Sequence, residues 1–220
     1  MKHGRLALII IFSALFLDQV VKIWIKTHMT LGQEYNILGD WFIIHFIENN
    51  GMAFGVELAG EFGKITLSIF RIIAVIAISY YLSILIKKQM PVGLIIAISL
   101  IVAGAAGNII DCAFYGLLFS ESTPYQLATF LPEGGGYSSF LHGKVVDMLY
   151  FPVIKGYIPD WFPFWSNKYF IFFRPVFNIS DSCITIGVFM ILLFQKRYFK
   201  PAEKTGAGSP EKPVQDPVNP

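Results

Sequence analysis

Four long apolar stretches, separated by polar segments, dominate the pattern of hydrophobic and polar positions in this chain. They cover residues 6–25, 65–86, 92–110 and 179–195. Each is close to the roughly 20 helical residues that cross the hydrocarbon core of a bilayer, so the pattern predicts four transmembrane helices. The first stretch is too long for a signal peptide and no small-residue cleavage site follows it, so we expect it to stay as an anchor.

Two further segments, residues 41–47 and 169–177, are aromatic and β-branched but too short to cross a membrane. This composition favours strands, and we predict that the two segments form a small sheet on the membrane surface. The predicted fold is therefore a membrane all-α bundle of four transmembrane helices with a small extracytoplasmic β-sheet region.

The chain divides into one membrane domain and a polar tail. The domain covers residues 1–200 and has two long outer loops, 27–64 and 112–178. Residues 201–220 are rich in Pro, Gly and charge, and we expect them to form a disordered cytoplasmic tail. Within the second loop, residues 117–142 contain prolines and three consecutive glycines, which predicts an exposed excursion.

Composition and charge agree with a membrane location. Of the 220 residues, 55% are hydrophobic and only 15% are charged, which excludes an ordinary soluble domain. Lys and Arg accumulate in cytoplasmic loops, and here they cluster before the first stretch, between the second and third, and after the fourth. Both termini are then cytoplasmic and both long loops lie outside. The net charge of +2 does not indicate a nucleic-acid partner.

Two aspartates within very apolar sequence are the strongest candidates for chemistry. Asp147 ends the string Gly-Lys-Val-Val-Asp, and Asp181 lies in Phe-Asn-Ile-Ser-Asp-Ser. A carboxylate in or beside hydrocarbon is costly, so it marks a functional position by default. Two such carboxylates predict a pair that shares a proton.

The spacing Asn-x-x-Asp occurs twice, at the end of the third predicted span and at the start of the fourth. Asn108 and Asp111 form the first pair, and Asn178 and Asp181 form the second. Residues three apart share a helix face, so each amide can orient its carboxylate, and the repeat predicts one polar site between two helices. The alternative is that Asn178 or Asp181 only caps the fourth helix.

Other polar residues carry less specific signals. Asp18 and Lys22 lie at i,i+4 in the first span, which favours an ion pair, although Lys22 could instead hydrogen-bond a substrate. Asn49 lies beside an Asn-Gly turn and could bind a substrate backbone. Cys112 and Cys183 fall near the outer ends of two spans, where a disulfide is conceivable but packing is the simpler interpretation. The four histidines are scattered, so we expect no metal site.

The order of these motifs closely resembles that of the lipoprotein signal peptidases, also called signal peptidase II. The resemblance spans nearly the whole chain apart from the tail. The matching strings are Asp18-Gln19 with Lys22, then residues 49–54, 107–111, 143–147 and 177–182.

The resemblance implies an aspartic endopeptidase of the bacterial inner membrane, with its active site toward the periplasmic face. Such an enzyme removes the signal peptide from diacylglyceryl-modified prolipoproteins, cutting before the lipidated lipobox cysteine. By motif match, Asp147 and Asp181 are the catalytic dyad. The supporting polar residues are Asp18, Lys22, Asn49, Asn108, Asp111 and Asn178. The implied partners are prolipoproteins and membrane lipid, with no cofactor, and we expect a monomer.

Two departures from the family pattern accompany the resemblance. Where the family commonly has Arg after Gly-Asn-x-x-Asp, this chain has Cys112, with Lys144 and Arg174 as candidate substitutes for the missing cation. Residues 117–142 also lengthen a connection that is usually short. Two other classes stay open: a proton-coupled carrier, although no inverted repeat is evident, and a membrane scaffold whose aspartates only cap helices.

Overall fold

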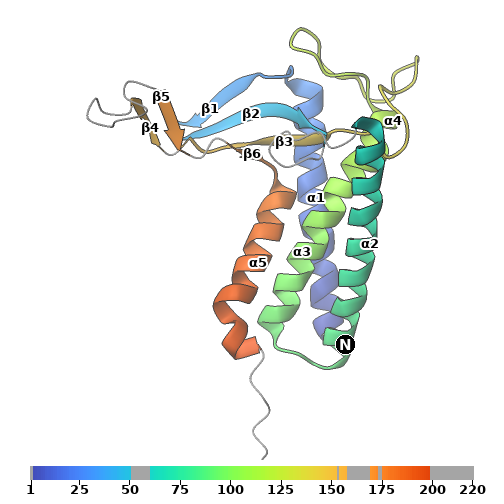
Figure 1. The fold of residues 1–220 in the computed structure, drawn as a ribbon, viewed down its shortest axis with the longest axis vertical. Coiled ribbons are helices and arrows are strands. Elements are labelled where there is room, and N and C mark those ends of the chain that lie inside the picture. The colour runs from blue at the N-terminus through green and yellow to red at the C-terminus, as the bar shows by residue number, and fades with distance from the viewer. Residues whose placement is uncertain (1, 51–59, 153, 158–168, 173–174, 199–220) are drawn as a thin grey trace, which may run out of the picture.

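The computed structural model describes residues 2–50, 60–152, 154–157, 169–172 and 175–198. Within this part of the chain, four helices are long and apolar enough to cross a membrane, which confirms the predicted spans (Figure 1). They are built on α1 (Lys2–His28), α2 (Gly60–Lys87), α3 (Val92–Ile110) and α5 (Ile179–Tyr198). The predicted tail, residues 201–220, lies outside the described residues.

The third span extends past its predicted end. After α3 the helix continues through a π-helical turn, η2 (Asp111–Tyr115), and a single α-helical turn, α4 (Gly116–Leu118). Residues 112–118 were predicted to begin an outer loop, and this boundary was wrong. The apolar pattern ends at the polar residues of the site, but the backbone hydrogen bonds continue through them.

Helix α3 is the central helix of the bundle. Half of its most apolar window is buried inside the structure, against 11–17% for the other three helices. The remaining helices expose large apolar side chains, as Leu8, Phe12 and Phe16 do along one face of α1. A bilayer is the solvent in which such a surface is stable, because lipid tails are as apolar as these side chains.

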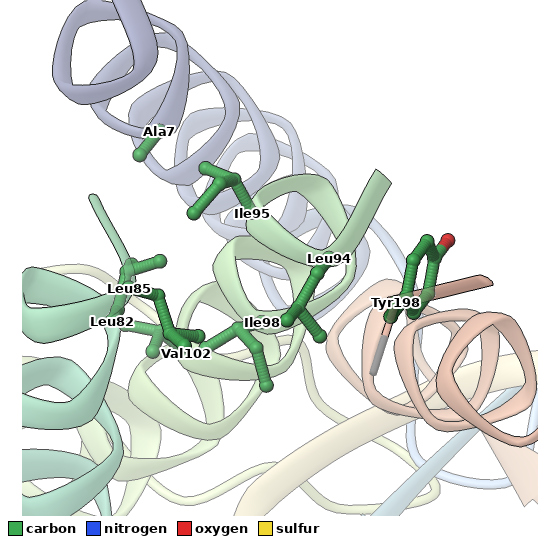
Figure 2. Close-up of a cluster of buried hydrophobic side chains, with 8 residues drawn as sticks. All are labelled: Ala7, Leu82, Leu85, Leu94, Ile95, Ile98, Val102 and Tyr198. Atoms are coloured by element: carbon green, nitrogen blue, oxygen red, sulfur yellow. The ribbon is translucent and has the colours of Figure 1, made fainter. Parts of the chain in front are cut away.

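A buried apolar cluster closes the end of the bundle away from the sheet. Figure 2 shows that all four helices contribute to it. Its buried members are Ala7, Leu82, Leu85, Leu94, Ile95, Ile98, Val102 and Tyr198. This packing fixes the helices relative to one another at the end opposite the polar residues.

Two glycines of α3 allow the other helices to approach the site closely. A Cβ at Gly104 would lie 2.2 Å from the Ser180 carbonyl oxygen on α5. A Cβ at Gly107 would lie 2.1 Å from Ser180 Oγ and 2.8 Å from Asp18 Oδ2 on α1. Small residues therefore bring α1, α3 and the start of α5 into direct contact, which positions the polar residues that these helices carry.

A four-stranded antiparallel sheet lies across the opposite end of the bundle (Figure 1). Its strands are β1 (Glu34–Leu38), β2 (Phe42–Asn49), β3 (Val145–Tyr150) and β6 (Val176–Phe177), in that order. The strand predicted at residues 41–47 corresponds to β2. Residues 169–177 divide between β6 and β5 (Tyr169–Phe172), and β5 pairs with β4 (Ile154–Tyr157) in a separate ribbon.

Most of residues 117–142 are exposed or half-buried, as their composition predicts, but three buried side chains anchor the segment. Phe119, Ser122 and Ala128 are buried, and the segment packs against the ends of α1 and the sheet. One of its glycines serves close backbone contact, because a Cβ at Gly136 would lie 2.1 Å from the Gly116 carbonyl oxygen. A Cβ at Gly134 or Gly135 would meet nothing within 4 Å. The Tyr137 N–H also donates to the Phe119 carbonyl at 2.9 Å. Glycine-rich composition cannot distinguish a loose turn from a segment that packs by backbone.

Candidate active site

Asn178 links the start of α5 to both aspartates of the predicted pair. Its Oδ1 accepts a hydrogen bond from the Asp181 N–H at 2.9 Å, and Asp181 Oδ2 accepts from the Asn178 N–H at 3.3 Å. This reciprocal arrangement is a helix cap, so the capping interpretation holds for Asn178. Its side-chain Nδ2 also donates to Asp147 Oδ1 at 2.7 Å. One carboxamide therefore caps the helix and contacts the second carboxylate.

Asn108 of α3 likewise makes several side-chain hydrogen bonds in this site. Its Nδ2 donates to Asp181 Oδ1 at 2.8 Å, and its Oδ1 accepts from Asn178 Nδ2 at 3.1 Å and from Lys22 Nζ at 3.0 Å. The two Asn-x-x-Asp motifs therefore meet in one polar site between α3 and α5, as their repetition predicts.

Asp147 reaches the same site from the sheet. It is buried on β3, and its Oδ2 accepts from Asn49 Nδ2 of β2 at 3.4 Å. Burial raises the pKa of Asp147 to about 7, and the nearby Asp181 carboxylate acts in the same direction. Hydrogen bonds from Asn178 and Asn49 and the charge of Lys22 oppose the rise. A carboxyl with this pKa can both hold and release a proton near neutral pH.

A buried cluster of charged side chains lies beside Asp147 and Asp181 in the same network. Lys22 Nζ lies 2.9 Å from Asp18 Oδ2 and 2.8 Å from Asp111 Oδ2, and all three side chains are buried. The i,i+4 ion pair predicted for α1 is therefore present, with Asp111 as a second anion. Each of these buried charges therefore has a partner of opposite sign, because the ammonium group pairs with both carboxylates.

Each anion of this cluster also holds the backbone beside one aspartate of the pair. Asp18 Oδ1 accepts from the Ser180 N–H at 2.9 Å, directly before Asp181. Asp111 Oδ2 accepts from the Val146 N–H at 3.3 Å, directly before Asp147. The ion cluster therefore fixes the backbone on both sides of the site.

Sequence reasoning missed one member of this network, Tyr115 of η2. Gln19 Nε2 donates to Asp18 Oδ2 at 3.1 Å and to Asp111 Oδ1 at 3.0 Å. The Tyr115 hydroxyl, buried in the turn after α3, donates to Gln19 Oε1 at 3.1 Å. Its position four residues after Asp111 was the available signal, because residues four apart share a helix face.

The structure thus brings all eight predicted site residues into one hydrogen-bonded network. They are Asp18, Lys22, Asn49, Asn108, Asp111, Asn178, Asp147 and Asp181. Within the described residues, no group of three or more His, Cys, Asp or Glu side chains is placed to hold a metal ion.

Cys112 is buried directly after Asp111, at the position where the family commonly has Arg. Both Cys112 and Cys183 are free thiols, so the packing interpretation holds. Lys144, one candidate substitute for that Arg, pairs instead with Glu48 at 3.7 Å and Glu121 at 3.5 Å. The other candidate, Arg174, lies outside the described residues. Arg71 of α2 is a cation beside this position, with its Nη1 4.0 Å from Cys112 Sγ.

Comparison with known proteins adds an independent line of support. A model of the family described as signal peptidase (SPase) II matches residues 10–196. This chain belongs to the signal peptidase II family. The match includes all eight residues of the network, so the predicted family is confirmed over the region that carries the site.

Relatives and solved structures agree with that membership. The lipoprotein signal peptidase of Porphyromonas gingivalis is 48% identical over 196 residues, covering 89% of this chain and 84% of the relative. That of Amoebophilus asiaticus is 38% identical over 183 residues, covering 82% and 73%. A bacterial membrane enzyme solved by the in meso method at 2.3 Å resolution has a TM-score of 0.57 and 26% identity, covering 91% of this chain and 94% of that one.

These findings confirm the predicted function at the level of the family. The chain is a signal peptidase II, a protease that removes the signal peptide from prolipoproteins. The predicted fold class, four transmembrane helices with a small sheet, is confirmed by the same comparisons and by the structure. The four membrane-spanning helices and the family both fit a bacterial, multi-pass membrane protein.

Proposed function

We propose that this signal peptidase II is an intramembrane aspartic endopeptidase whose catalytic dyad is Asp147 and Asp181. The observation that carries the proposal is the pair of carboxamides, Asn108 and Asn178, that connects the two carboxylates. Two carboxylates in one site resist double ionisation, so they retain a shared proton near neutral pH. The pKa at which this proton is lost belongs to the pair of carboxyl groups and not to either residue alone.

The reaction follows from this single shared proton. The ionised carboxylate accepts a proton from a water molecule as the water oxygen attacks the scissile carbonyl carbon. The protonated carboxyl donates its proton to the carbonyl oxygen, which gives a neutral tetrahedral intermediate. When the intermediate collapses, the C–N bond breaks and the leaving amine takes a proton from one carboxyl group. The other carboxylate takes the proton of a hydroxyl group as the carbonyl re-forms, which restores the single shared proton. Asn49, Asn108 and Asn178 hold the carboxylates in place while protons move.

The supporting residues have a different part in this proposal. Asp18 and Asp111 accept hydrogen bonds from the backbone beside the dyad, and Lys22 pairs with both of these carboxylates. They hold the dyad in position without touching the reacting atoms. The substrate we propose is a diacylglyceryl-modified prolipoprotein, cut before the lipidated cysteine. At the sheet end of the bundle, the signal helix and the acyl chains can stay in hydrocarbon while water reaches the dyad.

Orientation follows from the same geometry. The N-terminus and the end of α5 lie at the end of the bundle away from the sheet (Figure 1). Basic residues gather at that end: Lys2, Arg5, Lys87, Lys88, Lys196 and Arg197. By the preference of Lys and Arg for cytoplasmic segments, we infer cytoplasmic termini and an active site toward the periplasmic face of the inner membrane. We propose a monomer that contacts lipid and requires no nucleic acid or cofactor.

The proposed substrate is tested with the purified protein and matched precursors. One precursor carries diacylglycerol on the lipobox cysteine and the other is identical but unlipidated. We expect cleavage of the lipidated precursor alone, directly before the cysteine, as read by mass spectrometry. Equal cleavage of both would contradict the lipid requirement. Substrate-linked proton flux in liposomes without cleavage would instead favour a carrier.

The pKa of Asp147 predicts how the reaction depends on pH. Because burial and Asp181 raise this pKa to about 7, the dyad keeps its shared proton below that value and loses it above. We expect kcat/KM to fall as pH rises through about 7, approaching about tenfold per pH unit. Initial rates from pH 5 to 9 on the lipidated precursor measure this, with the folded fraction followed in parallel. A flat profile up to pH 9 would contradict the assignment.

A further inference from the structure

A second buried cluster of charged side chains lies beside the dyad network. Lys26, on the last turn of α1, is completely buried and forms an ion pair with Glu48 of β2. Its Nζ also donates to Ser122 Oγ at 2.8 Å, and that hydroxyl donates to Glu48 Oε1 at 2.8 Å. The three side chains close a triangle that joins α1, the sheet and the segment 119–144.

The segment 119–144 covers this triangle with aromatic rings. Lys26 Nζ lies 5.5 Å from the ring centre of Phe119 and 5.0 Å from that of Tyr137. Lys144 Nζ lies 5.4 Å from the same Tyr137 ring centre and 3.7 Å from Glu48 Oε2. Cations at this distance from aromatic rings are attracted to them. The lengthened connection therefore encloses a charged group that would otherwise face water.

Stability alone does not account for such a cluster. Replacing a buried ion pair by apolar residues of similar size is often neutral or stabilising, because both charges must lose their hydration. Hydrogen-bonded charges do differ from apolar side chains in one respect: their contacts are directional. Such contacts can fix the position of the backbone elements that carry them.

Strand β2 connects the cluster to the dyad. Glu48 pairs with Val146 of β3, and its neighbour Asn49 pairs with Val145. Consecutive side chains on a strand point to opposite faces, so Glu48 faces the cluster while Asn49 faces the site. Asn49 Nδ2 contacts Asp147 Oδ2 at 3.4 Å, near the upper limit of a hydrogen bond. A small displacement of β2 would break this contact.

We propose that the Lys26–Glu48–Ser122 cluster is a positioning device that locks β2 against α1, so that Asn49 meets Asp147. On this view the segment 119–144 is a working part of the enzyme, because it supplies Ser122 and the rings over Lys26. The proposal rests on the proposed dyad, and it assigns Glu48 and Lys26 no contact with the substrate or the reacting atoms.

The first test replaces Glu48 by Gln in the full-length enzyme. Loss of the charge removes the ion pair with Lys26, and we expect kcat on the lipidated precursor to fall roughly tenfold or more, with KM nearly unchanged. The matched control is Glu121→Gln. Glu121 also contacts Lys144, at 3.5 Å, but its side chain is 64% exposed, so we expect wild-type kinetics.

The pH profile separates positioning from simple support of the fold. Asp147 is faced by Asp181 of α5, Lys22 of α1, Asn49 and Asn178. Burial and Asp181 raise the pKa of Asp147, whereas Asn178, Lys22 and Asn49 lower it. Weakening the Asn49 contact removes one hydrogen bond that lowers the pKa of Asp147. In Glu48→Gln, the fall of kcat/KM at alkaline pH should therefore move to higher pH. Asn49→Ala should give the same shift, and Glu48→Gln/Asn49→Ala no further shift, because both changes act on one contact.

A second variant guards against loss of folding. Lys26→Met/Glu48→Leu removes both charges together, so neither is left buried without its partner. We expect this variant to have the folded fraction of the wild type, measured by size-exclusion chromatography, while kcat stays low. Wild-type kcat and pH profile per folded molecule in this variant and in Glu48→Gln would overturn the proposal. Activity in Asp147→Asn would instead overturn the dyad, whatever the Glu48 variants show, so the two failures are distinguishable.

Discussion

Replacing either Asp147 or Asp181 by Asn is expected to lower cleavage of a diacylglyceryl-modified prolipoprotein by roughly 10²–10⁴-fold, the range that a positioned acid or base contributes. Asn is nearly isosteric with Asp and can still accept a hydrogen bond from Asn178 or Asn108. It can neither take a proton from water nor give one to the scissile carbonyl. The change therefore removes the chemistry and leaves the packing in place.

The effect is measured as kcat/KM on purified, membrane-extracted protein. Asp40→Asn is the matched control, because Asp40 is an exposed aspartate beside β1 that accepts from Asn36. It should retain full activity. Normal turnover by purified Asp147→Asn or Asp181→Asn protein would refute the dyad.

The same substitution has an expected sign for stability. The pKa of Asp147 is raised by burial and by Asp181 from an ordinary value of about 3.9 to about 7 in the folded protein. The folded state therefore binds this proton more strongly than the unfolded state does. The resulting stability is complete below about pH 4 and is lost as pH rises through about 7. At pH 8, Asp147→Asn should melt at the same temperature as the wild type or higher, as expected of a site that trades stability for function.

The largest loss of stability is expected from Lys22→Met. This change leaves Asp18 and Asp111 buried without their shared cation, and breaking a buried ion pair in this way costs about 3–5 kcal/mol. The backbone N–H groups of Ser180 and Val146 would lose well-placed acceptors as the carboxylates move, so activity should fall as well.

Thermal unfolding in detergent measures this effect against Lys88→Met, a change at an exposed lysine beyond α2. The triple variant Lys22→Met/Asp18→Asn/Asp111→Asn should recover much of the lost stability, because no uncompensated charge is left. An unchanged melting temperature in Lys22→Met alone would show that the carboxylates do not depend on Lys22.

Much of the site could be predicted from sequence because membrane spans leave little choice for polar groups. An Asp or Lys inside an apolar stretch must find a partner, and residues three or four apart on a helix meet on one face. This reasoning places Asn108 and Asp111 on one helix face, where both contact Lys22, and it pairs Asp18 with Lys22. It extends across the bundle because the glycines of α3 indicate where another helix can approach.

Strand pairing could not be predicted in the same way. Residues 145–148 of β3 are all buried, so the strand lacks the alternation of apolar and polar positions that would identify it. Its place between β2 and β6 depends on register, which no local pattern encodes. The contact between Asn49 and Asp147 therefore followed only from the structure. The burial of Ser122 escaped prediction for a related reason, because its partners Lys26 and Glu48 are distant in the chain.

The attachment of Ser180 and Val146 to carboxylates that share one ammonium group has a consequence for the enzyme in its bilayer. Membranes vary in thickness, and helices respond by tilting. Because both attachments converge on the same point of the first helix, a tilt of that helix carries the two acids along as a unit. We therefore expect the separation of the two aspartates to change little with the thickness of the membrane.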